Sequence, residues 1–144
     1  MTDSLTEDSL LAANERFYRT FERLDYPALA ALWEESERTF CLHPGWMPLF
    51  GPKAVMDSWK RIIENTAEIR FTLTGAQALI CGEIGVVTVF ESIQNVLGDE
   101  RNTSGTFATN LFAFEHDQER WMLFHHHASH AASPYEIEEG TLLV

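Results

Sequence analysis

Three consecutive histidines stand near the end of the chain, within residues 124–130, whose sequence is FHHHASH. Imidazole groups bind transition metals and exchange protons near neutral pH, but they also occur as ordinary strand residues. Side chains of a β-strand alternate between the two faces of a sheet. His125 and His127 therefore share one face and His126 points to the other, so the chemistry of each face has to be considered separately.

His125 and His127 are the pair that could hold a metal ion together, because their backbones lie about 6.5–7 Å apart along a strand. A structural zinc site needs four ligands, and a catalytic zinc site needs three protein ligands and a water. The third ligand would have to be His130 or a residue of the neighbouring strand. The chain has no Cys-x-x-Cys, His-Glu-x-x-His or glycine-rich phosphate-binding pattern. We therefore expect no metal and no other cofactor.

The strand over residues 106–115 sets the partners of the histidine strand. A five-residue turn over residues 116–120 would place Asn110 opposite His126 and Phe112 opposite Phe124. This face is strongly apolar, and we expect Phe112 and Phe124 to line a cavity on it. The opposite face is more mixed and suits an interface between two subunits; it would carry Leu111, Ala113, Trp121, Leu123, His125 and His127.

Glu91 lies on the strand before these two, over residues 85–96. A loop centred between Glu100 and Arg101 would place Glu91 opposite Asn110. Glu91, Asn110 and His126 would then form a polar row across three strands inside an apolar cavity.

This row has two readings. Burial raises the pKa of a carboxyl group and lowers that of an imidazole, so Glu91 and His126 could act as base and acid on a substrate. Their strands are about 9–10 Å apart, which leaves room for a substrate or a water between them. Alternatively, the two groups and Asn110 form a satisfied polar network that binds a ligand or only water.

Other residues could line the same cavity. His43 begins the loop HPGW, and its side chain either faces the cavity or fixes the loop. We expect Trp46 and Trp59 to contribute cavity wall and core, and Tyr18 either to donate its hydroxyl into the cavity or to pack. Cys41 and His43 share a strand face, but their backbone separation of about 6.5–7 Å makes a nucleophilic thiol–imidazole pair difficult.

The elements that must position these residues follow from the periodicity of apolar side chains. Helical spacing predicts helices over residues 8–23, 26–33 and from Val55 onward, and a short strand is expected over residues 38–43. Everything from Glu68 to about His130 is typical of β-structure, with strands over 69–79, 85–96, 106–115 and 121–130. This order predicts an α+β domain in which three N-terminal helices pack on a curved antiparallel sheet.

Composition limits the remaining possibilities. The 144 residues fit one domain over residues 1–144, with an acidic tail from about residue 131 to 144. A formal net charge of −12 disfavours binding to nucleic acids. No apolar stretch approaches the roughly 20 residues of a membrane span, and the acidic N-terminus has no signal-peptide core. With two cysteines, the chain is expected in the cytoplasm.

The layout, the HPGW loop after the first strand and the ending W-x-L-x-H-x-H-x-S over residues 121–129 resemble the NTF2-like superfamily. The most similar branch is that of the SnoaL-like proteins of bacteria. The last strands are also similar to the association domain of calcium/calmodulin-dependent protein kinase II. The resemblance implies a cone-shaped α+β fold, a pocket between the bent sheet and the long first helix, and homodimers formed through the outer face of the sheet.

The resemblance does not select one function, because this superfamily contains enzymes and non-catalytic modules alike. We expect a protein that binds a small apolar or carboxylate-bearing ligand in an apolar cavity with a few polar groups. One alternative is an acid–base enzyme of isomerase, cyclase, dehydratase or hydrolase type that uses Glu91 and His126. The other alternative is an assembly module without catalysis.

Overall fold

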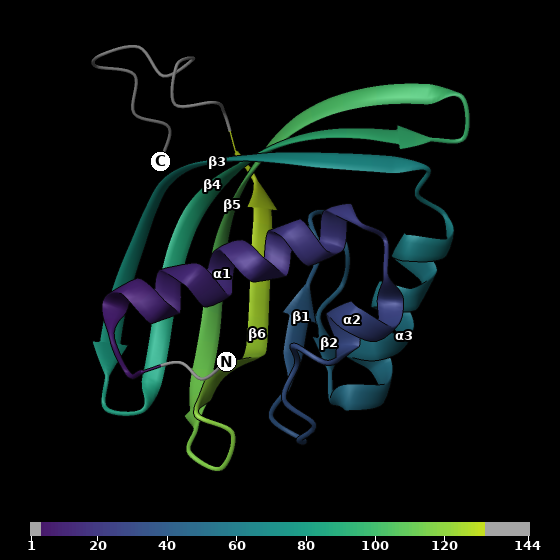
Figure 1. Ribbon diagram of the computed structural model, residues 1–144. Coiled ribbons are helices and arrows are strands. Elements are labelled where there is room, and N and C mark those ends of the chain that lie inside the picture. Colours follow the sequence, from purple (N-terminus) through teal and green to yellow (C-terminus); the bar gives the residue numbers. More distant parts are fainter. Residues whose placement is uncertain (1–3, 132–144) are drawn as a thin grey trace.

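The computed structural model describes residues 4–131, and in this part of the chain three helices and six strands form a mixed α+β domain (Figure 1). The first half contains α1 (Glu7–Glu22), α2 (Tyr26–Ala30), β1 (Phe40–Leu42), β2 (Leu49–Phe50) and α3 (Pro52–Glu64). The second half is four long strands, β3 (Glu68–Cys81), β4 (Ile84–Leu97), β5 (Glu100–Glu115) and β6 (Arg120–His130). The predicted fold class is confirmed.

Side chains at the helix starts explain where the first two helices begin. The hydroxyl of Thr6 accepts a hydrogen bond from the backbone N–H of Ser9, and the Ser9 side chain accepts one from the N–H of Thr6. This reciprocal pair satisfies two N–H groups that a helix start leaves without partners. Asp25 caps α2 in a similar way by accepting from the N–H of Ala28, and Pro27 occupies the first turn.

The six strands form one sheet in the order β2-β1-β6-β5-β4-β3. All neighbouring strands are antiparallel except β1 and β6, which run parallel to each other. Figure 1 shows the sheet curving around α1, with α2 and α3 beside the edge formed by β1 and β2. The parallel pair places the start of the HPGW loop beside the histidines of β6, because Leu42 pairs with His127.

The core lies between α1 and the concave face of the sheet. Apolar residues of α1, α3 and the long strands are almost completely buried there. Examples are Leu10, Phe17, Val55, Trp59, Val89 and Leu123, each no more than 1% exposed. Burial of side chains of this size stabilises a fold by about 1.5–3 kcal/mol each.

A β-bulge in β6 corrects the predicted alternation of that strand. The pairing of β5 with β6 shifts between Leu111 and Phe112, so that Leu111 pairs with His125, Phe112 pairs with Leu123, and Phe124 has no partner opposite it. An extra residue of this kind reverses the facing of all residues on one side of it.

The bulge therefore brings Trp121 and Leu123 onto the core face, where they are 3% and 0% exposed. Placing them at an outer interface was wrong. Phe124 instead lies on the outer side, half-buried, with the guanidinium of Arg38 4.2 Å from its ring centroid. The predicted turn over residues 116–120 is one residue too long, because Glu115 pairs with Arg120, and the extra residue of the bulge offsets this difference. The predicted pair of Asn110 with His126 is therefore confirmed.

A tight turn between β4 and β5 corrects the predicted position of Glu91. Leu97 pairs with Glu100, so the turn consists of Gly98 and Asp99 only. Gly98 has φ of 63°, a left-handed conformation that favours glycine in two-residue hairpin turns. In the resulting register Glu91 pairs with Thr106, and Asn110 pairs with Val87. The single row of Glu91, Asn110 and His126 is thus not formed.

Within residues 4–131 no helix is long and apolar enough to cross a membrane. Residues 132–144 of the expected acidic tail lie outside the described residues.

Candidate ligand cavity

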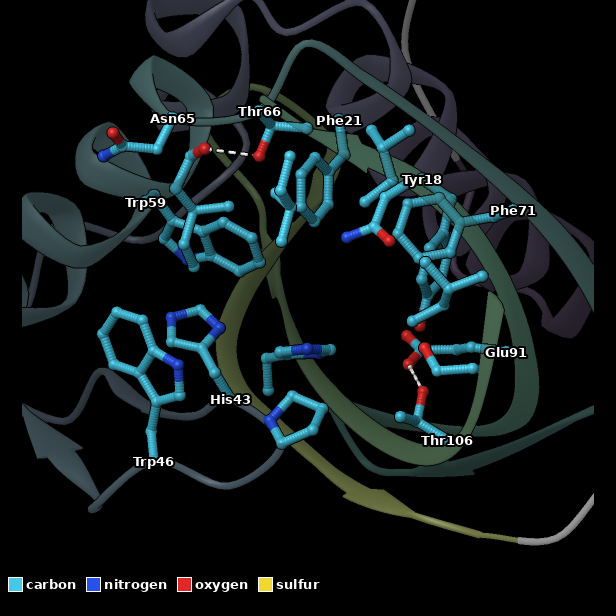
Figure 2. Close-up of a pocket in the computed structure, with 18 of the residues that line it drawn as sticks. Tyr18, Phe21, His43, Trp46, Trp59, Asn65, Thr66, Phe71, Glu91 and Thr106 are labelled. Atoms are coloured by element: carbon cyan, nitrogen blue, oxygen red, sulfur yellow. Dashed lines mark hydrogen bonds between the residues drawn. The ribbon is translucent and has the colours of Figure 1, made fainter. Parts of the chain in front are cut away.

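A cavity of about 510 Å³ lies between the concave face of the sheet, α1 and α3. Its walls are mainly aromatic and aliphatic side chains: Phe17, Tyr18, Phe21, Trp46, Trp59, Ile62, Ile69, Phe71, Ile93 and Leu97. Figure 2 shows labelled polar side chains, His43, Glu91 and Thr106, around the same hollow as Trp59, Phe21 and Tyr18. The volume falls in the range of about 300–1,000 Å³ typical of small-molecule sites.

His126 begins a hydrogen-bonded network at the inner end of the cavity. Its Nδ1 lies 2.6 Å from Oδ1 of Asn110. Because an amide oxygen only accepts, Nδ1 carries the proton and donates. The Asn110 amide nitrogen in turn donates to Oδ1 of Asn14 at 2.9 Å and to the hydroxyl of Tyr18 at 3.0 Å. All four side chains are at least 96% buried, so each bond forms away from water.

Glu91 ends this network. The hydroxyl of Thr106, the cross-strand partner of Glu91, donates to its Oε1 (dashed in Figure 2). The Tyr18 hydroxyl interacts with the same carboxyl group. Tyr18 thus links Asn110 to Glu91, and the polar groups expected in one row are connected through α1 and not through the sheet register alone.

His43 occupies the cavity wall at the end of β1. Its Nε2 lies 2.9 Å from Oγ of Ser58, and the Ser58 hydroxyl donates to the backbone carbonyl of Val55 at 2.6 Å. The ring of His43 packs edge-to-face on Trp59, with centroids 4.7 Å apart. His43 therefore both lines the cavity and fixes the loop to α3.

Cys41 lies closer to His43 than expected. Its Sγ is 3.5 Å from Nε2 and 3.8 Å from Nδ1 of the imidazole. Burial and the charge of Glu91 raise the pKa of the Cys41 thiol. The group is therefore a neutral thiol at physiological pH, which makes it a poor nucleophile despite the contact.

Burial also shifts the pKa values of the other titratable groups in the cavity. It lowers the pKa of His43 to about 4 and that of His126 well below its usual value. It raises the pKa of Glu91, although the hydrogen bonds from Thr106 and Tyr18 oppose this shift. Burial and the nearby Glu91 raise the pKa of Tyr18. At neutral pH both imidazoles are thus uncharged and Tyr18 keeps its proton.

The cavity brings together most residues expected from the sequence. Six of them line it: Tyr18, His43, Trp46, Trp59, Glu91 and His126. Asn110 lies behind this lining and bonds to two of its members. Phe112 is buried in the core and Phe124 lies on the outer side, so neither of these two lines the cavity.

Sequence reasoning missed three polar or aromatic contributors. Thr106 and Asn14 complete the network, and Phe71 forms wall. The dipeptide Gly98–Asp99 is a two-residue hairpin signal that would have set Thr106 opposite Glu91. Asn14 lies on the apolar face of α1, and a buried amide needs a hydrogen-bond partner, so its position in the sequence indicated a polar contact inside the core.

Among the described residues, the paired histidines on the outer side gain no third ligand. The rings of His125 and His127 are 6.4 Å apart, and Phe40 stacks on His125 at 4.4 Å. In residues 4–131 no group of three or more His, Cys, Asp or Glu side chains is arranged to hold a metal ion. That the protein works without a metal stays a prediction.

Comparisons with known proteins place this architecture in a family. Residues 10–133 match the family model of the SnoaL-like domain. A proposed dehydratase of the NTF2-like family from Streptomyces avermitilis is 32% identical, with a TM-score of 0.81 over 88% of this chain and 96% of that one.

Two further matches are more distant. A proposed calcium/calmodulin-dependent protein kinase type II association domain from Thiobacillus denitrificans is 24% identical, with a TM-score of 0.74 over 92% of this chain and 98% of that one, and shows the fold alone. The F-box protein SKIP8 of Arabidopsis thaliana is 26% identical over 125 residues, 86% of this chain. The chain spans about half the length of that curated relative. The family model covers most of the chain, and the chain therefore belongs to the SnoaL-like domain family of NTF2-like proteins.

Proposed function

We propose that the protein binds a small, largely apolar molecule with one or two polar groups in the cavity between α1 and the sheet. The observation that carries this proposal is the cavity of about 510 Å³, with mainly apolar walls and a buried polar network at its inner end. Binding sites for small molecules combine apolar walls with a few oriented polar groups in this way.

A second function, acid–base catalysis, is favoured by one specific observation. Two hydroxyl groups, those of Thr106 and Tyr18, converge on the buried Glu91. A buried carboxyl group with a raised pKa can exchange a proton with a bound substrate. His126 would then take part as a neutral imidazole at the same site. The relative described as a proposed dehydratase is compatible with this chemistry.

The binding proposal is tested by blocking the cavity. Ile93 lines it and is only half-buried, so Ile93→Trp should fill the space and leave the fold intact. Gln94→Trp is the matched control, because Gln94 is the exposed neighbour on the same strand.

We expect ring compounds bearing an amine, hydroxyl, ketone or carboxylate group to give saturable binding in titration calorimetry. Ile93→Trp should abolish that binding and Gln94→Trp should retain it. Equal binding to both variants would exclude the cavity as the site, and absence of binding by every compound would favour an assembly module.

We also propose a homodimer formed through an aromatic patch on the outer side of the sheet. The patch consists of Phe40, Phe50, Phe107, His125 and His127. Phe50 is 70% exposed and Phe107 45% exposed, which is unusual for side chains of this size.

For the cellular location of the protein we propose the cytoplasm, since Cys41 and Cys81 are both free thiols.

A further inference from the structure

In the polar network at the inner end of the cavity, several hydrogen-bond donors are already bonded to other members of the network. The His126 Nδ1–H is bonded to Asn110, and the Asn110 amide is bonded to Asn14 and Tyr18. The Thr106 hydroxyl is bonded to Glu91. A neutral imidazole that donates from Nδ1 has a bare lone pair on Nε2. His126 therefore offers an acceptor to the cavity.

His43 also has one ring nitrogen with a bare lone pair, for a different reason. The Ser58 hydroxyl has one proton, and that proton is donated to the carbonyl of Val55. Its oxygen can therefore only accept from His43, so Nε2 of His43 carries the ring proton. The Nδ1 atom is left with a lone pair and has only the weak thiol of Cys41 beside it, at 3.8 Å. A second acceptor thus lines the cavity, with the two imidazole centroids 6.4 Å apart.

Glu91 adds a carboxyl group to these two lone pairs. The one cationic side chain among the described lining residues, Arg61, is exposed at the rim. The inner end consequently presents acceptors to a ligand. A ligand carboxylate there would meet imidazole lone pairs and the carboxyl group of Glu91, which costs free energy among buried side chains.

The walls and the overall charge favour the same kind of ligand. Rings of Phe17, Tyr18, Phe21, Trp59 and Phe71 form one continuous aromatic part of the cavity wall, with neighbouring centroids 4.9–5.6 Å apart. Aromatic rings attract cations through their quadrupole, and this attraction grows when water is excluded. The formal net charge of −12 also raises the local concentration of cations around the protein.

We propose that the cavity selects a small organic amine, bound as its ammonium ion between Glu91 and the aromatic walls, with His43 and His126 accepting its remaining N–H groups. This inference rests on the proposed function and names the chemical class of its ligand. It replaces the carboxylate-bearing ligand expected from the sequence, because the inner end supplies acceptors where a carboxylate needs donors.

Three probes that share one ring and differ only in the polar end test the proposal: phenethylamine, phenethyl alcohol and phenylacetate. Titration calorimetry at pH 7 with the unaltered protein should give affinities in the order amine, alcohol, carboxylate. Equal affinity for amine and alcohol, or a preference for the carboxylate, would overturn the proposal.

A charge-neutral variant isolates the role of the carboxylate. Glu91→Gln should weaken phenethylamine binding by about tenfold or more, because the bond to a charged group is lost, and change phenethyl alcohol binding by less than about threefold. Glu37→Gln removes the same charge from an exposed residue away from the cavity and should change neither affinity. Parallel losses for amine and alcohol in Glu91→Gln would contradict an ammonium partner.

A measurement on the unaltered protein covers the case in which Glu91→Gln fails to fold. Nitrogen chemical shifts should identify a protonated Nδ1 and a bare Nε2 on His126, and the reverse tautomer on His43. A protonated Nε2 on His126 would supply a donor to the cavity and refute the inference. This outcome differs from failure of the proposed function, in which none of the three probes binds or Ile93→Trp leaves binding unchanged.

Discussion

His125 and His126 are sequence neighbours with opposite environments. His126 is 4% exposed and belongs to the cavity network, whereas His125 stacks on Phe40 on the outer side. Strand alternation alone predicted this separation, because no bulge intervenes between the two residues. The helix partners of Asn110, the residue bonded to His126, were less predictable. Asn14 and Tyr18 come from α1, about 90 residues away in the sequence, and no local pattern connects a helix residue to a particular strand residue.

His43 makes the stability of the protein depend on pH. Its pKa is about 4 when folded, below the ordinary 6.5, so the unfolded chain binds a proton between these pH values that the folded protein does not bind. The free energy of unfolding therefore decreases as the pH falls through this window. Urea denaturation should show that wild type loses about 2 kcal/mol relative to His43→Gln between pH 7 and pH 4.5. A difference between the two proteins that does not change with pH would contradict the buried neutral imidazole.

At the scale of elements, the strands were predictable and their exact pairing was not. Alternating apolar residues and turn residues located all four long strands, because these signals are local. The bulge at Phe124 has no comparable signal. It depends on whether Leu123 or Phe124 faces the core, and Leu123 is held there by its bridge to Trp33 and by backbone hydrogen bonds with Leu32 and Glu34. The parallel pairing of β1 with β6 is likewise a long-range choice.

The bulge predicts an inverted order of stability losses for two adjacent residues. Leu123→Ala should lower the free energy of unfolding by about 2–5 kcal/mol, because it leaves a void in the core. Phe124→Ala should cost only about 1–2 kcal/mol, because the ring is half-exposed and loses mainly its contact with Arg38. Urea denaturation of both variants measures the difference. Uninterrupted alternation predicts the larger loss for Phe124→Ala, and that result would show that the bulge is absent.

At the scale of the whole molecule, the curved sheet separates the two features for which functions are proposed. Its concave side, which curves around α1 (Figure 1), lines the cavity together with α1 and α3, while its outer side carries the aromatic patch. The resemblance to NTF2-like proteins implied this division from the sequence. The prediction that Trp121 and Leu123 lie on the outer side was wrong, because both side chains are buried in the core.

The aromatic patch predicts that one charge will separate the subunits of the proposed dimer. Phe107→Asp places a carboxylate in the patch, and burying it unpaired in an interface is costly. Light scattering should give the mass of a monomer for this variant. Leu79→Asp, at another exposed apolar residue on β3, is the control and should keep the dimer mass. A Phe107→Asp protein with the wild-type mass would exclude the patch as the interface.

The most direct test of the cavity as a ligand site is an NMR titration of the unaltered protein with the tightest-binding phenethyl compound. Side-chain signals of His43, His126 and the Trp59 indole report on the cavity, while those of His125 and His127 report on the outer side. We predict saturable shifts of the three cavity signals with one common affinity, and no shift of the two outer histidines. Shifts confined to His125 and His127 would place the ligand on the opposite side of the sheet and contradict the account.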